Sequence, residues 1–271
     1  METQKEMSFL DHLEELRWHI IRALAGVMIA ATAAFLAKAF IFETLIFGPT
    51  KADFFTYEFL CNASKLLGFE SFCDTNFDFE VQSRTMAGQF SAHIWTSITF
   101  GLIVAFPYVL YEFWKFISPG LYSKEKNSSR GFIVISSILF FIGVLFGYYI
   151  VCPLSINFLG TYSVADQVHN DFDLNSYIGL IRASTLASGF IFELPIVIYF
   201  LTKIGLVTPE FLRKNRKYAL VIVLIFAAII TPPDIASQVI VAIPVLILYQ
   251  VSILISKLVL RNQKRKEKNG K

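Results

Sequence analysis

A single acidic residue stands in the middle of a long apolar segment. Glu193 is the one charged residue between positions 183 and 201. A charged side chain at bilayer depth costs several kcal/mol, about 2.5–3.5 kcal/mol on insertion scales, so membrane helices seldom carry one without a role. Glu193 therefore predicts either a polar groove that receives another membrane helix or a protonatable group coupled to a proton gradient. The structural alternative is a neutral carboxyl group that hydrogen-bonds neighbouring helices.

Pro195 favours the groove. A proline removes a backbone hydrogen bond and kinks a helix, which helps to shape a concave face around Glu193. A proton relay would need further acidic residues at the same depth, and the apolar segments supply none. We therefore expect Glu193 and Pro195 to line a membrane groove.

The elements that hold Glu193 are expected to be membrane-spanning helices. The 271-residue chain is 55% hydrophobic and 17% charged, whereas soluble domains average about 25% charged residues. A spanning helix needs about 20 apolar residues. We predict an all-α integral membrane protein with one membrane domain, residues 1–271, and six transmembrane helices in a concave bundle. The expected spans are 23–42, 94–110, 132–151, 183–201, 218–231 and 235–256, of which the fifth reaches only about 21 Å.

The distribution of lysine and arginine predicts the orientation. If both termini are cytoplasmic, the inner segments hold 19 of the 24 basic residues. Cytoplasmic loops of membrane proteins carry such an excess. We therefore expect a multi-pass membrane protein with both termini in the cytoplasm. The inner segments are then 1–22, 111–131, 202–217 and the basic tail 257–271.

The segments between the spans have distinct expected structures. Phe9, Leu13 and Leu16 recur at helical spacing, which predicts an amphipathic helix over 7–19 that lies on the cytoplasmic surface and turns into the bilayer near Arg22. The first outer loop, 43–92, is rich in apolar residues and is expected to form a cap of short helices. The second outer loop, 154–178, is acidic.

The cysteines and histidines indicate no cofactor. Cys61 and Cys73 share the first outer loop, where an oxidising compartment permits a disulfide, but spacing alone does not decide whether they are bridged. Cys152 is expected to be a small packing residue. No Cys/His spacing predicts a metal site, and no haem or nucleotide motif is present.

Five ordered motifs resemble the TatC family, the multispanning subunit of the twin-arginine protein translocase. Each is a weak pattern alone, but together they extend over nearly the whole chain. The first outer loop is longer than is typical, and its two cysteines are not part of the family pattern. The motifs are HLEELR at 12–17, FISPGLYSKE at 116–125, FELP at 192–195, LRKNR at 212–216 and TPPD at 231–234 with Ser237 and Gln238.

The resemblance implies a receptor without covalent chemistry. Members bind the twin-arginine signal peptides of folded export substrates. With single-span partners of the TatA and TatB kind, they organise transport driven by the proton motive force. A homo-oligomer within a receptor complex, contacts with membrane lipid and no nucleic acid partner are the matching expectations.

The resemblance also implies a signal-peptide site. Glu15 and Glu125 match the family's binding carboxylates, and Leu16, Arg17 and Phe116 match positions that support them. Two adjacent guanidinium groups need carboxylate acceptors, and bidentate Arg–carboxylate pairs are strong and selective. The alternatives are solvated glutamates that pair with nearby basic residues, and ordinary interfacial packing for Phe116.

The outer end of the fifth span is the third candidate site. The family match makes Thr231 and Gln238 candidates for holding a polar residue of a partner's membrane helix. Interhelical hydrogen bonds of about 0.6–2 kcal/mol suit reversible docking. Asp234 is expected to cap the sixth helix instead.

Two other function classes are less consistent with the sequence. A secondary transporter that uses Glu193 for coupling would be expected to show internal repeats and symmetric broken helices. An intramembrane hydrolase would need a Ser–His pair, two membrane aspartates or a histidine cluster, and His93 has no such partner set.

Overall fold

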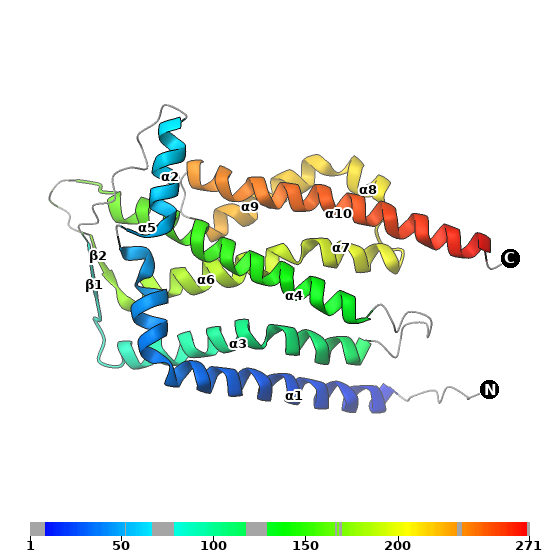
Figure 1. Cartoon of the computed structure of the whole chain (residues 1–271), viewed down its shortest axis with the longest axis horizontal. Helices are drawn as coiled ribbons and strands as arrows, with labels where there is room; N and C mark the ends of the chain where they lie inside the picture. Colours follow the sequence, from blue (N-terminus) through cyan, green and yellow to red (C-terminus); the bar gives the residue numbers. More distant parts are fainter. Residues whose placement is uncertain are drawn as a thin grey trace. The chain divides into compact units, whose positions relative to one another are not determined.

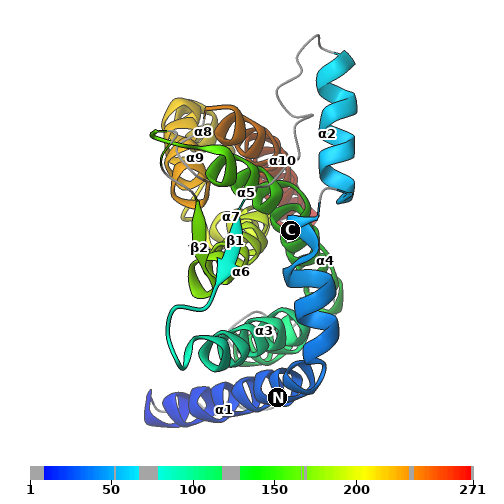
Figure 2. The same ribbon diagram turned by 90° about the vertical axis from the view of Figure 1, so that its left-hand side faces the viewer.

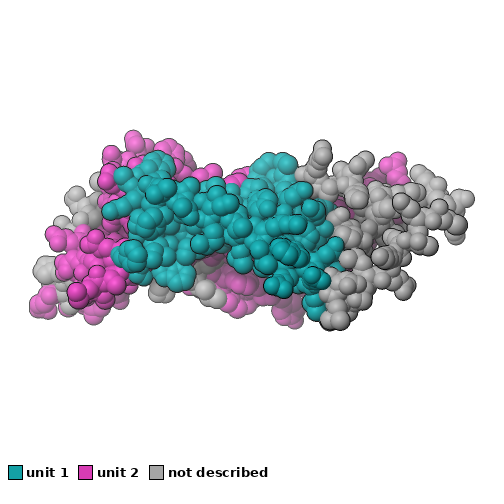
Figure 3. Space-filling model, turned by 90° about the horizontal axis from the view of Figure 1, so that it is seen from below, with its two compact units in different colours: residues 1–41, 90–138 teal, residues 42–89, 139–271 magenta. Residues whose placement is uncertain are grey.

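The computed structural model describes residues 9–51, 53–66, 79–117, 129–165, 167, 170–231 and 235–269. The chain divides into two compact units, coloured separately in Figure 3. Unit 1 holds residues 1–41 and 90–138, and unit 2 holds residues 42–89 and 139–271. The described residues are predominantly helical, as the sequence predicts for an all-α membrane protein.

Unit 1 is built on an antiparallel pair of long helices, α1 (Phe9–Leu36) and α3 (Gly88–Ile117), joined by the first part of α4 (Ser129–Phe146). Figure 1 shows α1 and α3 side by side. The two helices contact each other at both ends of the pair. At one end the ring of His12 stacks on that of Phe116, and at the other end the ring of Phe35 stacks on that of His93 with centroids 3.9 Å apart.

Small residues let the two helices of unit 1 approach closely. A Cβ atom added to Gly101 would lie 2.6 Å from the backbone nitrogen of Ala31, and one added to Gly26 would lie 2.6 Å from the Tyr108 ring. Small residues serve this purpose in membrane helices, where close van der Waals contact drives association. Gly101 is therefore a position that a larger side chain cannot occupy without separating α1 from α3.

The predicted separate helix over residues 7–19 is wrong. Helix α1 continues from Phe9 through the first apolar segment to Leu36 without a turn near Arg22. Residues 9–25 contain no proline or glycine, and each residue added to an existing helix gains a hydrogen bond. A change of helix direction near Arg22 would need a helix-breaking residue, and amphipathic spacing is no evidence for one.

Unit 2 contains the remaining long helices. After α4, a π-helical turn η5 (Gly147–Val151) leads into α5 (Cys152–Thr161). The next helices are α6 (Leu174–Phe192), α7 (Leu194–Lys203), α8 (Pro209–Lys214), α9 (Arg216–Ile230) and α10 (Ile235–Asn269). Figure 1 shows α7 beside α10, where the Thr202 hydroxyl donates to the Ser256 hydroxyl at 2.8 Å.

Five helical stretches among the described residues are long and apolar enough to cross a membrane: His12–Leu36, Gly88–Ile117, Gly131–Thr161, Leu174–Lys203 and Ser237–Gln263. They include most of the five longer predicted spans. The short predicted span 218–231 coincides with α9, which has 15 residues. The number of six spans and the placement of the termini stay predictions.

The segment of unit 2 between α1 and α3 packs on η5 and α5. A π-helix η1 (Phe40–Ile46) and a short 3-10 turn η2 (Gly48–Thr50) precede α2 (Phe55–Leu66). The Tyr57 hydroxyl donates to the carbonyl of Pro49 at 2.7 Å, and the Thr56 hydroxyl donates to the carbonyl of Tyr149. Burial raises the pKa of Tyr57 well above its usual range, which keeps this hydroxyl a donor.

Two short strands join the outer loops, which the all-helical prediction did not include. Strand β1 (Glu80–Gln82) pairs in parallel with β2 (Asp171–Asp173), as Figure 2 shows. The Arg84 guanidinium donates to the carbonyl of Asp171 at 3.0 Å. Strands of three residues are too short to show an alternating pattern.

The cysteine predictions are partly covered by the described residues. Cys61 is disulfide-bonded, whereas Cys73 lies outside the described residues. Cys152 is a buried free thiol packed at the start of α5.

Candidate functional site

One candidate site lies where α1 begins and α3 ends in unit 1. We call its members the α1–α3 end cluster: His12, Glu15, Leu16, His19, Glu112 and Phe116. Both Glu15 and Leu16 lie three or four residues from His12 and from His19, so the four α1 members occupy one broad side of the helix. Glu15, Leu16 and His19 are half-buried, whereas the neighbouring side chains of Arg17 and Trp18 are exposed. This face of α1 is therefore the one that packs on α3.

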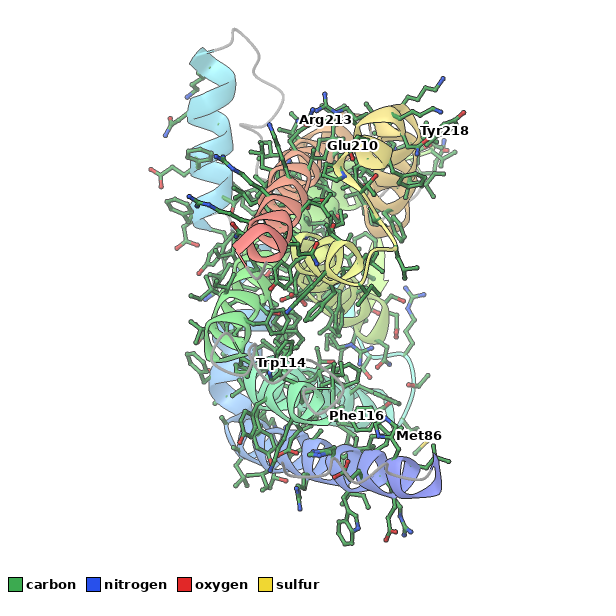
Figure 4. The ribbon with its side chains drawn as sticks, turned by 90° about the vertical axis from the view of Figure 1, so that its right-hand side faces the viewer. Met86, Trp114, Phe116, Glu210, Arg213 and Tyr218 are labelled. Atoms are coloured by element: carbon green, nitrogen blue, oxygen red, sulfur yellow. The ribbon has the colours of Figure 1, made fainter. Side chains whose placement is uncertain are left out.

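An aromatic contact joins the two helices in this cluster. The ring of Phe116 stacks on that of His12, with centroids 4.5 Å apart and an interplanar angle of 22°. The same phenylalanine ring lies 6.2 Å from that of His19 in a tilted arrangement. Figure 4 labels Phe116 together with Trp114 on α3. Phe116 thus contacts the face of α1 that carries Glu15.

A polar pair lies one turn of α3 away. The Nδ1 atom of His19 is 2.6 Å from Oε2 of Glu112, and the two side chains are 12% and 5% exposed. This partly buried hydrogen bond links α1 to α3. No local signal in the sequence indicates this pair, because its members are 93 residues apart. The one available indication was that His19 lies near the start of the first apolar helix and Glu112 near the end of the second, where two antiparallel helices would bring them to the same end.

The structure brings together three of the five residues predicted for signal-peptide binding. Glu15, Leu16 and Phe116 lie in the α1–α3 end cluster. Arg17 is exposed and lies outside the packed face of α1. Glu125 lies outside the described residues.

The second candidate site surrounds Glu193 in unit 2. Glu193 is the C-cap of α6 and the N-cap of α7, and the residue is 9% exposed. Its carbonyl accepts from the backbone nitrogens of Ile196 and Val197 at 2.9 and 3.0 Å. Pro195 is buried in the first turn of α7. The interruption that Pro195 predicts is therefore confirmed, with Glu193 at the break.

Apolar clusters lie on both sides of this break. Ile191, before Glu193, packs against the cluster of Val223, Ala242 and Val245 from α9 and α10. Leu194, after it, packs against a cluster that includes Ile198 and residues of α8 and α10. The α6–α7 break at Glu193 is thus flanked by packed apolar side chains on both sides.

The third candidate pair makes hydrogen bonds within unit 2. The Thr231 hydroxyl donates to the carbonyl of Ala227 at 2.8 Å, and the Gln238 amide nitrogen donates to the carbonyl of Leu224 at 3.1 Å. Both side chains therefore satisfy carbonyls near the end of α9. Each keeps an oxygen that can accept a further hydrogen bond. Asp234 lies outside the described residues.

The described residues contain no group of three or more His, Cys, Asp or Glu side chains that could hold a metal ion. The geometry of the α1–α3 end cluster instead suits recognition of a cation. The same face of α1 carries the Glu15 carboxylate and the imidazoles that contact Phe116, and carboxylates and aromatic rings are the groups that bind a guanidinium.

Comparisons with known proteins agree on one family. The family described as "Sec-independent protein translocase protein (TatC)" matches residues 11–244. A TatC protein of a Blattabacterium from Periplaneta americana is 46% identical over 93% of this chain and 96% of its own length. The Aquifex aeolicus TatC protein is 34% identical over 97% of this chain and all of its own.

Solved structures give the same answer for the fold. A crystal structure described as the twin arginine translocase receptor TatC covers 92% of this chain and 99% of its own, with a TM-score of 0.67 and 34% identity. A second structure of that receptor, in the detergent DDM, has a TM-score of 0.69 and 33% identity, with 90% of this chain covered. These likenesses support a multi-pass membrane protein with a role in twin-arginine transport, rather than a catalytic enzyme. The chain belongs to the TatC family of Sec-independent protein translocase proteins.

Proposed function

We propose that this TatC-family chain is the core receptor subunit of a twin-arginine translocase. It binds the twin-arginine signal peptides of folded proteins at the cytoplasmic face of the inner membrane. It also scaffolds partners of the TatA and TatB kind for export driven by the proton motive force. Its contact with the arginine pair is made by Glu15 and Glu125, with Leu16, Arg17 and Phe116 in support.

The position of Glu15 is the observation that carries this proposal. Its side chain is half-buried on the face of α1 that packs on α3. Within the described residues, its carboxylate takes part in no ion pair, neither with Arg17 nor with any other basic side chain. A half-buried carboxylate on the face of α1 that packs on α3 supports binding of an external guanidinium group better than a fully solvated glutamate would.

Glu14 provides a matched control for the test. It is exposed and lies about 100° around α1 from Glu15. We expect Glu15→Ala to weaken binding of a fluorescent twin-arginine peptide to the detergent-purified protein by about tenfold or more, because a hydrogen bond to a charged group contributes about 1.5–3 kcal/mol. Glu125→Ala should have a similar effect, and Glu14→Ala should leave the affinity near that of the wild type. Equal affinities for all three variants and the wild type would remove the site.

A membrane groove at Glu193 and Pro195 is the second part of the proposal. The buried Glu193 and Pro195 at the α6–α7 break support it, because a carboxyl group at bilayer depth favours a polar partner. The groove would receive the apolar part of the signal peptide or a partner's membrane helix.

Thr231 and Gln238 are proposed to dock a partner's membrane helix. The remaining acceptor oxygens of both side chains support this role. Photocrosslinks from residues next to Gln238 to a TatA- or TatB-type protein would test it, with Thr231→Val and Gln238→Leu as the variants expected to lose them. A homo-oligomeric receptor complex is part of the same proposal.

A further inference from the structure

The pair of His19 and Glu112 brackets the proposed carboxylate site. Along α1, Glu15 lies about 4.5 Å beyond His12 and about 6 Å before His19, on the same face. His12 is fixed by its stack on Phe116, and His19 by its 2.6 Å contact with Glu112. Glu15 therefore stands between two contacts that both reach α3.

These two contacts differ in strength and direction. A stack of rings allows sliding in the ring plane. A hydrogen bond between two polar side chains has a preferred distance and angle. The His19–Glu112 pair thus sets the rotation of α1 about its own axis at this end, and that rotation decides where the carboxylate of Glu15 points.

We infer that His19 and Glu112 are positioning residues for the signal-peptide site: their pair fixes the rotation of α1 so that Glu15 is aligned for a guanidinium group. This inference rests on the proposed function. A guanidinium presents a planar fork that needs an aligned carboxylate, whereas a lysine ammonium is a point charge that tolerates misalignment. The pair should therefore contribute to the preference for arginine over lysine.

A purely structural role predicts a different result. If the pair did no more than hold the fold together, its loss would lower the fraction of protein that binds any peptide. The relative affinity for the two peptides would stay unchanged in the molecules that remain folded. Affinity and binding capacity must therefore be measured separately.

The test uses the full-length protein in detergent and two peptides, one with the arginine pair and one with two lysines in its place. We expect Glu112→Ala to weaken twin-arginine binding about tenfold and di-lysine binding less than about twofold. Glu112→Gln, whose amide oxygen still accepts from the imidazole, should lie between Glu112→Ala and the wild type. The double variant His19→Glu/Glu112→His, which restores a partner across the helices, should recover most of the preference.

The other end of the same helix pair supplies the control. The imidazole of His93 stacks on Phe35 and its Nε2 lies 3.1 Å from the Phe35 carbonyl. His93→Gln removes a cross-helix contact of similar kind but far from Glu15, and it should leave the ratio of the two affinities unchanged. A ratio that also stays unchanged in Glu112→Ala, Glu112→Gln and His19→Gln would overturn the inference.

Failure of the inference and failure of the proposed function give different patterns. If the wild type binds both peptides equally, or if Glu15→Ala has no effect, the receptor site itself is wrong. If the wild type prefers arginine and depends on Glu15 while the pair variants keep that preference, the positioning role alone is wrong. Should Glu112→Ala fail to fold, Glu112→Gln and His19→Gln decide the question.

Discussion

Two buried glutamates, one in each unit, are used in different ways. Glu112 of unit 1 lies within the continuous helix α3 and reaches the imidazole of His19 on another helix. Glu193 of unit 2 lies where α6 stops and α7 starts. The difference teaches that a carboxyl group in a membrane helix can fasten two helices together or mark the point at which one helix is interrupted.

The packing around the two glutamates differs as well. Many apolar side chains of α1 are exposed, including Leu24, Met28, Ile29 and Leu36. The α6–α7 segment instead packs between apolar clusters from α9 and α10. Unit 1 therefore depends more on a few specific contacts between α1 and α3, and unit 2 on distributed apolar packing.

The largest expected effect is on the contact between α1 and α3 in unit 1, and it comes from a substitution at Gly101. In Gly101→Ala the new Cβ would meet the backbone of Ala31 at 2.6 Å, and a backbone cannot move aside without separating the helices. We expect a loss of about 1–3 kcal/mol, measured as a lower thermal unfolding midpoint in detergent. Gly131, which has open space around it, is the control: Gly131→Ala should be neutral or stabilising. Equal midpoints for the two variants would contradict the close approach.

The role of Glu193 gives the next largest effect. We expect Glu193→Ala to reduce the export rate of a twin-arginine reporter more than Glu193→Gln does. A neutral amide can keep the hydrogen bonds of a buried polar site, whereas alanine leaves its partners unsatisfied at a cost of about 1–3 kcal/mol. Reporter export in cells with matched amounts of protein would measure it. Equal loss in both variants would favour a titrating carboxyl group over a groove.

The smallest effect belongs to the hydrogen bond between α7 and α10. Thr202 and Ser256 are fully buried and their hydroxyl oxygens are 2.8 Å apart. A double-mutant cycle with Thr202→Val and Ser256→Ala should give a coupling of about 0.6 kcal/mol in unfolding free energy. A coupling several times larger would mean that unit 2 depends on specific contacts as much as unit 1 does.

Sequence reasoning succeeded where a local signal existed. The apolar lengths predicted the long helices, and Pro195 predicted the interruption beside Glu193. Each of these rests on residues close together in the chain, so one segment contains the whole signal.

The features that sequence reasoning missed depend on contacts distant in the chain or on the absence of a breaker. His19 and Glu112 meet across 93 residues, and the pairing of β1 with β2 joins two loops. Nothing within either short segment shows such a partner. Amphipathic spacing over 7–19 predicts a separate helix, but no proline or glycine interrupts residues 9–25, and α1 is therefore continuous.

Residue-level photocrosslinking of a twin-arginine signal peptide tests the central claim most directly. A photoreactive group placed beside the arginine pair should label α1 around His12–Leu16 and α3 around Phe116, and labelling should fall sharply when the arginines are replaced by lysines. Labels confined to unit 2, or equal labelling by both peptides, would contradict the assignment of the α1–α3 end cluster as the receptor site.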